Sequence, residues 1–288
     1  MKNSVLLALL LSASVGTAFA QRDVRRGIPI DRQAYIKVYL LHGSVHVVGW
    51  DRDSLAVTGT VEKGSLFFGG SGGSAKLGVW EEKGFEAGTA RLEVRVPAAS
   101  TIWIKSESAD VSVSGVTGGL DVYSVTGAVR IEGSLRQLYA ESMGGRLDVA
   151  ASAPSVRLKT AGGAIAFRGG GEDVTISTVS GRIDATAGRP LRARLETVTG
   201  DIHFAGGVER GGSLTFQTHS GAVNLGLPSG LDAEISVATF QGDITNGLDP
   251  RKTADRDLRG REVSFLSGRG GAQIWVRTFS GDVILRAR

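Results

Sequence analysis

The sequence predicts an all-β protein, a single-domain parallel β-solenoid (β-helix) of about ten rungs with two short strands in each rung. Glycine supplies 42 of the 288 residues and proline only six, a balance typical of many tight turns between short strands. A turn motif recurs every 18–21 residues, and apolar residues alternate with polar ones on both sides of it. Together these observations predict stacked repeats, each burying one face against its neighbours.

The repeated motif is Thr/Ser-x-x-Gly, and the spacings between successive glycines are 18, 18, 18, 19, 21, 21 and 39 residues. The last interval fits one 21-residue repeat that carries an 18-residue insertion. Apolar residues lie five and seven positions before each glycine and two positions after it, which is typical of strands with one buried face. The eight glycines are Gly127, Gly145, Gly163, Gly181, Gly200, Gly221, Gly242 and Gly281.

The repeat predicts the structural role of three of its positions. The glycine is expected to allow the positive φ of a tight turn. The serine or threonine three residues earlier shares the parity of the buried positions, so we expect it to face inward and bond turn amides. Ile165, Ile183 and Ile202 follow successive glycines by two residues and are expected to form one buried column.

The same template extends backwards to Ala109 and Gly43, which gives ten rungs and a body roughly 48 Å long. A first break in the pattern covers about residues 62–90. We expect part of it to form an extra hairpin, with Gly69–Gly73 as a mobile loop. Its aromatic residues are expected to cover an end of the solenoid or, alternatively, to form a partner surface: Phe67, Phe68, Trp80 and Phe85.

A second break, about residues 246–271, is charged and rich in arginine, and it is predicted to protrude as a loop. The closing strand, residues 281–286, is expected to leave a sheet edge open to end-to-end self-association. We expect the second insertion to fold over this edge as a cap, with Val263, Phe265 and Leu266 packed down.

Residues 1–20, MKNSVLLALLLSASVGTAFA, have the features of a secretory signal peptide cleaved after Ala20. The apolar run Val5–Leu11 is too short to span a bilayer. We therefore expect the mature domain, residues 21–288, to be exported to the periplasm or the cell surface without a transmembrane segment. The chain contains no cysteine, which excludes disulfide bonds and cysteine nucleophiles.

No catalytic site is predicted. Gly69-Gly70-Ser71-Gly72-Gly73 matches the G-x-S-x-G pattern of a nucleophile elbow, but no helical segment follows it to expose the serine. β-Helix enzymes that cleave polysaccharides gather acidic or basic residues on one face of adjacent rungs. The outward positions after the turn glycines instead mix arginine, alanine and aspartate.

No metal or cofactor is predicted either. The four histidines fall on different rungs and faces, so they form no ligand cluster: His42, His46, His203 and His219. Aspartates follow the turn glycine only at Asp201, Asp243 and Asp282. Arg182 beside Asp201 suits a surface ion pair, and Asp243 and Asp282 become neighbours only if the second insertion loops out.

The sequence resembles the bacterial putative-adhesin family of secreted β-solenoids, whose domain has no assigned function. The likeness lies in YIKVYLLHGSVHVVGWDRDSL, LEVRVPAASTIWIKSESADVSV, the T-x-S-G turns and the closing GAQIWVRTFSGDVIL, and it covers nearly all of residues 28–285. The resemblance implies an exported solenoid of the cell envelope.

The net charge of +4 is too small to favour nucleic acid as a partner. We expect a non-enzymatic, envelope-associated scaffold or adhesin-like binding module, with a cell-surface glycan or an envelope protein as partner. A carbohydrate-active β-helix enzyme and a self-assembling structural protein are the alternatives.

Overall fold

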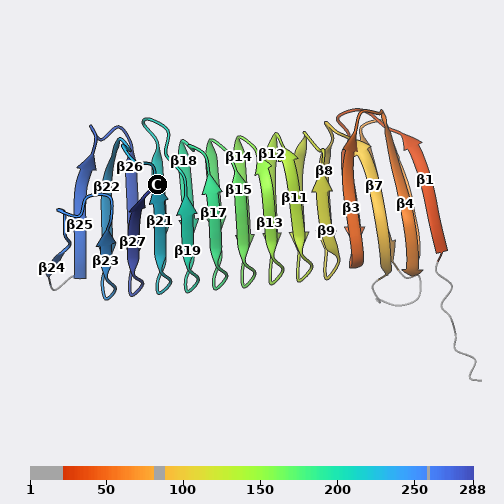
Figure 1. Cartoon of the computed structure of the whole chain (residues 1–288). Helices are drawn as coiled ribbons and strands as arrows, with labels where there is room; N and C mark the ends of the chain where they lie inside the picture. Colours follow the sequence, from red (N-terminus) through yellow and green to blue (C-terminus); the bar gives the residue numbers. More distant parts are fainter. Residues whose placement is uncertain (1–21, 81–87, 258–259) are drawn as a thin grey trace, which may run out of the picture.

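The described part of the chain forms two long β-sheets that extend side by side (Figure 1). A computed structural model describes residues 22–80, 88–257 and 260–288, and all regular elements in these ranges are β-strands. The sheets have 13 and 14 strands and enclose one continuous cluster of buried side chains. This confirms the predicted all-β, solenoid-like class. The predicted signal peptide lies outside the described residues.

The order of the strands across each sheet differs from their order along the chain. The 13-stranded sheet contains β1 (Arg22–Pro29), β4 (Ser54–Lys63), β7 (Thr89–Pro97), β3 (His42–Trp50), β9 (Asp110–Ser114), β11 (Val129–Ser134), β13 (Leu147–Ser152), β15 (Ile165–Gly169), β17 (Ile183–Ala187), β19 (Ile202–Ala205), β21 (Val223–Leu227), β27 (Val283–Ala287) and β23 (Ile244–Asn246). The 14-stranded sheet contains β24 (Asp255–Asp257), β25 (Gly260–Ser267), β22 (Ala233–Thr239), β26 (Gln273–Thr278), β20 (Ser213–Gln217), β18 (Arg192–Glu196), β16 (Asp173–Ser177), β14 (Ser155–Thr160), β12 (Gln137–Ser142), β10 (Gly119–Ser124), β8 (Thr101–Ser106), β2 (Tyr35–Leu40), β6 (Ser74–Trp80) and β5 (Ser65–Ser71).

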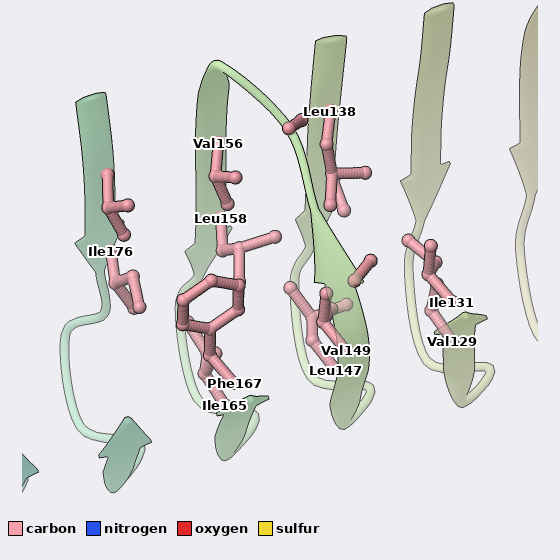
Figure 2. Close-up of a cluster of buried hydrophobic side chains, with 14 of the residues drawn as sticks. Val129, Ile131, Leu138, Leu147, Val149, Val156, Leu158, Ile165, Phe167 and Ile176 are labelled. Atoms are coloured by element: carbon pink, nitrogen blue, oxygen red, sulfur yellow. The ribbon is translucent and has the colours of Figure 1, made fainter. Parts of the chain in front are cut away.

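From β8 to β21 the chain alternates between the sheets, and each strand pairs in parallel with the corresponding strand of the next repeat. Ile183 lies between Ile165 and Ile202 in this register, and all three side chains are fully buried. The predicted isoleucine column is thus confirmed. Figure 2 shows a stretch of the same core, where Leu138 and Ile165 come from opposite sheets. Burial of each such side chain stabilises the fold by about 1.5–3 kcal/mol.

The serine and threonine column lies inside the molecule. Thr178 is buried, its hydroxyl oxygen accepts a hydrogen bond from the Gly181 amide at 3.0 Å, and the hydroxyl donates to the Ala161 carbonyl at 3.2 Å. The same bond to a turn amide joins Thr197 and Gly200. The expected inward hydroxyls are therefore confirmed, and they link each turn to its neighbour.

The turn glycines are required for a different reason from the one expected. None of the eight glycines of the repeated motif adopts a positive φ. A Cβ atom at Gly181 would instead lie 2.0 Å from the carbonyl oxygen of Gly163 in the adjacent turn. Close stacking of turns, rather than left-handed backbone, excludes a side chain here.

The first insertion continues both sheets. Strands β5 and β6 form the expected antiparallel hairpin, but Gly69–Ser71 pair with Ser74–Lys76, so the predicted loop at Gly69–Gly73 is wrong over its first half. The turn uses Gly72, whose φ is +52°. Strand β6 also pairs in parallel with β2, and β7 with β3, so the break in the sequence pattern is not a break in the structure.

The last two strands of the chain, β26 and β27, do not lie at the end of the sheets. Strand β27 is placed between β21 and β23, and β26 between β20 and β22, all in parallel. The expectation that residues 281–286 leave an open edge is wrong. The chain forms β22 and β23 further out first and then returns, which gives β27 hydrogen-bonding partners on both sides.

The second insertion covers the outermost strand of this end. Strand β25 pairs antiparallel with β22, so the predicted protruding loop is wrong for this part of the segment. Val263 and Phe265 are 5% and 7% exposed, as expected of a cap, whereas Leu266 is 65% exposed. Leu266 points outward because alternate residues of a strand face opposite sides.

Candidate binding surface

Six aromatic side chains form a continuous stripe on the outer face of the 14-stranded sheet. They come from six consecutive strands at its amino-terminal end, β5, β6, β2, β8, β10 and β12. The side chain of Trp80 is 54% exposed and the others are half-buried. We call this stripe the aromatic row, and its members are Phe67, Trp80, Tyr39, Trp103, Tyr123 and Tyr139.

The rings of the aromatic row contact one another in the order Trp80, Phe67, Tyr39, Trp103, Tyr123 and Tyr139. The ring centroids of Tyr39 and Trp103 are 5.2 Å apart, those of Trp103 and Tyr123 5.7 Å, and those of Tyr123 and Tyr139 5.4 Å. Phe67 continues the row from Tyr39 at 6.2 Å and reaches Trp80 at 4.8 Å. All these pairs are tilted, a geometry that aromatic rings prefer over a face-to-face sandwich.

The row follows a zigzag because aromatic and charged residues alternate in a checkerboard. Trp103 lies opposite Lys37 on one side and Asp121 on the other, while Tyr123 lies between Lys105 and Glu141. From Tyr39 to Tyr139 each ring therefore meets the next diagonally, because charged side chains occupy the positions in direct register. Phe67 is the exception, since it lies in direct register with Tyr39 across Gly78. The outer surface therefore combines aromatic faces with positively and negatively charged side chains that can form hydrogen bonds.

Gly78 makes room for the outer end of the row. A Cβ atom at this position would lie 2.7 Å from Cζ of Phe67, so the ring can cross Gly78 only because it has no side chain. Lys76, two residues earlier, places its Nζ 5.1 Å from the ring centroid of Tyr39 and 5.5 Å from that of Phe67. These cation–π contacts hold both rings.

Asp121 and two tyrosines of the row, Tyr123 and Tyr139, have raised pKa values, so each holds its proton more readily than usual. Burial raises the pKa of the Asp121 carboxyl. Burial, together with the nearby carboxylates of Asp121 and Glu141, raises the pKa of Tyr123. The pKa of Tyr139 is raised further, by burial and by the hydrogen bond that its hydroxyl donates to Glu141. Both phenols therefore stay protonated donors at neutral pH.

The row can bind a ring-shaped or extended ligand by stacking. Half-buried rings held by their neighbours lose little side-chain entropy on binding. Within the part of the chain that the structure describes, the hydroxyls of Tyr39 and Tyr123 make no hydrogen bond, which leaves both available to a ligand. The surface therefore offers aromatic faces together with hydrogen-bonding groups.

A tryptophan elsewhere on the same face shows the contrast. Trp275 on β26 is 52% exposed and lies in the same outward column as Trp103. Its neighbours in register are Thr215 and Ser236, so it stands beside hydroxyls instead of rings. A single exposed tryptophan in such surroundings offers one face only.

The sequence singled out part of this surface. Phe67 and Trp80 join the aromatic row, whereas Phe68 packs against the buried core and Phe85 lies outside the described residues. Sequence reasoning missed the other four members of the row: Tyr39, Trp103, Tyr123 and Tyr139. Their signal was present, because each occupies an outward position of its repeat where polar residues prevail elsewhere.

The histidines have separate surroundings. The Nδ1 atoms of His42 and His203 lie 2.6 Å from the Ser108 hydroxyl and 3.1 Å from Asp184. His219 stacks on Phe279. Among the described residues, no three histidine, aspartate or glutamate side chains are placed to hold a metal ion together.

Two of the aspartates after the turn glycines, Asp201 and Asp282, accept backbone amides, whereas Asp243 pairs with Arg261. Asp201 accepts the Ala222 amide at 2.9 Å, and Arg182 pairs with Asp184 at 2.8 Å, so the expected pair between Arg182 and Asp201 is wrong. Asp282 accepts the amide of Asp243 at 2.8 Å, which confirms that the two residues are neighbours once the insertion lies outside.

The glycine-rich match to a nucleophile elbow sits at the tip of the β5–β6 hairpin. Ser71 pairs with Ser74 across this tip, and strand follows strand without a helix. The geometry is that of a tight hairpin, not of a strand–turn–helix nucleophile elbow.

The fold and the repeat identify the family. A family model described as Toastrack DUF4097 matches residues 39–286, and the chain belongs to this family. The resemblance to the putative-adhesin family is thereby confirmed. No curated protein matches the chain. The described residues contain no helix long and apolar enough to cross a membrane.

Several solved structures are similar to this chain. A putative adhesin from Bacteroides fragilis NCTC 9343 has a TM-score of 0.47 and 9% identity, with 93% of this chain and 98% of that chain covered. A putative adhesin from Parabacteroides merdae ATCC 43184 has a TM-score of 0.41, 14% identity and coverage of 92% and 96%. A putative lipid binding protein from Parabacteroides distasonis ATCC 8503 has a TM-score of 0.44, 11% identity and coverage of 91% and 96%. At such low identity, a likeness in structure does not imply a shared ligand.

Proposed function

We propose that this protein is an exported, non-enzymatic binding module of the cell envelope that holds a cell-surface glycan on its aromatic row. The observation that carries the proposal is the unbroken contact of six aromatic rings across six neighbouring strands. At the spacing of β-strands, such a row is roughly 24 Å long. A ligand that matches it is extended and carries many rings.

A glycan has the chemistry that this surface complements. The C–H face of a sugar ring is apolar and stacks on an aromatic face, while the hydroxyls at its rim need hydrogen-bonding partners. The checkerboard supplies both, because Lys105, Asp121 and Glu141 flank the rings. Since these charges have both signs, the surface does not suit a dense polyanion such as nucleic acid.

Export and a non-catalytic role are parts of the same proposal. The composition of residues 1–20 supports secretion, with the mature domain in the periplasm or at the cell surface. Two carboxylates on the outer face of this sheet are held by neighbours: Glu141 by Tyr139 and Glu196 by Arg194. Such groups anchor the surface and are not poised as free acids or bases.

The test is a glycan-binding screen followed by calorimetric titration of the mature protein with linear oligosaccharides of neutral hexoses and N-acetylhexosamines. We expect Trp103→Ala to weaken binding of the selected glycan at least tenfold, which corresponds to about 1.4 kcal/mol. Trp275→Ala is the matched control, because it removes an exposed tryptophan from the same outward column. Equal affinity of the two variants, or no binding of any glycan, would contradict the proposal.

A further inference from the structure

A second exposed feature runs along the edge where the two sheets are joined by the repeated turns. The residue directly after each buried serine or threonine points outward, and most of these residues are large and apolar. Val125, Met143 and Val179 are 42%, 56% and 53% exposed. We call this line the turn ridge, and its members in spatial order are Val125, Met143, Ala161, Val179, Val198, His219, Phe279 and Phe240.

Backbone hydrogen bonds between turns keep the ridge straight. The amide of Val198 donates to the carbonyl of Val179 at 3.0 Å, and the amide of Val179 donates to Ala161 at 3.1 Å. The amide of His219 continues the ladder to Val198 at 3.0 Å. One ridge side chain therefore follows another at the spacing of neighbouring strands, about 4.8 Å.

A groove follows the ridge on the side of the 14-stranded sheet. It has a volume of about 610 Å³ and extends from β12 to β20. Ridge side chains from Met143 to His219 line one wall. The other wall is polar and consists of the last outward residues of these strands: Glu141, Lys159, Ser177, Glu196 and Gln217.

The groove begins where the aromatic row ends. Tyr139 is the last ring of the row, and its hydroxyl donates to Glu141, which is the first residue of the polar wall. Both residues belong to β12. A linear ligand that follows the row therefore enters the groove without changing direction.

We infer that the groove is a second subsite for the same glycan, which is a linear, largely neutral chain long enough to pass from the aromatic row into the groove. This inference rests on the proposed function of the row. One apolar and one polar wall fit the two kinds of surface that a sugar ring presents. The groove adds roughly 19 Å of contact, given five strands at the usual spacing.

Other occupants fit the groove less well. An acyl chain would bury Glu141, Lys159 and Glu196 against hydrocarbon, which carries a large desolvation penalty. A second copy of the protein would find a ridge only one side chain wide, whereas stable protein interfaces bury about 800 Å² on each partner.

The experiment compares a tetrasaccharide with an octasaccharide of the glycan selected in the screen, both titrated into the mature protein. For the unmodified protein we expect the octasaccharide to bind about tenfold more tightly. Ser177→Trp fills the groove from an outward position of β16, and Val179→Asn removes an apolar ridge contact. Each variant is expected to reduce octasaccharide affinity to that of the tetrasaccharide, while tetrasaccharide affinity stays unchanged.

A matched control is Asn224→Trp, which places the same bulk at an outward position of β21 on the opposite sheet and should change neither affinity. If Trp103→Ala abolishes binding of both chains but the groove variants leave the gain with length intact, the inference is overturned and the proposed function stands. If Trp103→Ala has no effect, the proposed function fails. Two other results would also overturn the inference. If the protein binds vesicles and Val179→Asn alone removes this binding, the groove binds lipid. If light scattering shows a dimer that Val179→Asn alone removes, the groove binds a second copy.

Discussion

The inner and outer faces of the 14-stranded sheet follow different rules along the same strands. Inward positions are apolar along the whole sheet, and from β8 to β26 a buried serine or threonine precedes each turn. Outward positions change along the molecule, from rings at Trp103 and Tyr139 to hydroxyls at Thr175 and Thr215 in the same column. The repeated residues of the inner face determine the fold. The residues of the outer face vary, and their aromatic members place the candidate binding surface in the amino-terminal half of the sheet.

The largest expected effect comes from placing a charge on the inner face. Ile183→Asp buries an unpaired carboxylate in the isoleucine column, and we expect a loss of stability on the order of 4 kcal/mol or more. Thr186→Asp, at an exposed position of the same strand β17, is the control and should have little effect. Thermal and urea unfolding measure both variants, and equal melting temperatures would mean that the two faces do not differ as described.

A smaller effect is expected at the stacked turns. Gly181→Ala drives a Cβ atom against the Gly163 carbonyl, and we expect a loss of about 1–3 kcal/mol. Gly188→Ala is the control, because no atom lies within 4 Å of its added Cβ. Urea unfolding that shows equal stability for the two variants would show that close stacking is not what requires glycine in the repeated turn.

The smallest effect concerns the charge within the aromatic row. Because burial raises the pKa of Asp121, the folded protein binds its proton more tightly than the unfolded chain does. Stability from this group is therefore present at low pH and is lost as pH rises from about 4 through the raised pKa. Asp121→Asn removes this loss.

The measurement for Asp121 is the difference in unfolding free energy between the two proteins across acidic pH. We expect the Asn variant to gain stability relative to the unmodified protein as pH rises through this window. Asp232 and Asp249, whose pKa values are lowered by hydrogen bonds, have opposite slopes but cancel in the difference. A difference that does not change with pH would mean that Asp121 is fully solvated.

Much of the fold could be predicted because the inward pattern is repeated so regularly. The alternation around each turn glycine located the buried columns and the inward hydroxyls. The order of β22 and β26 could not be predicted, because their inward residues match and either strand fits equally well beside β20. Only the path of the chain through its second insertion distinguishes them.

The aromatic row could be predicted only in part. Phe67 and Trp80 attracted notice because they lie close together in a segment that departs from the repeat. Tyr39 and Trp103 are far apart in the sequence and meet diagonally across two strands that the first insertion separates. Contacts of this kind depend on which strands are neighbours, so they become visible only once the register is known.

The central claim is tested most directly by making the amino-terminal half of the outer face resemble the other half. Trp103→Thr and Tyr139→Thr together replace two rings of the row with the residue type found at Thr175 and Thr215. Calorimetric titration with the selected octasaccharide should show binding reduced at least a hundredfold, with a melting temperature close to that of the unmodified protein. Unchanged affinity in a folded double variant would contradict the assignment of glycan binding to the aromatic row.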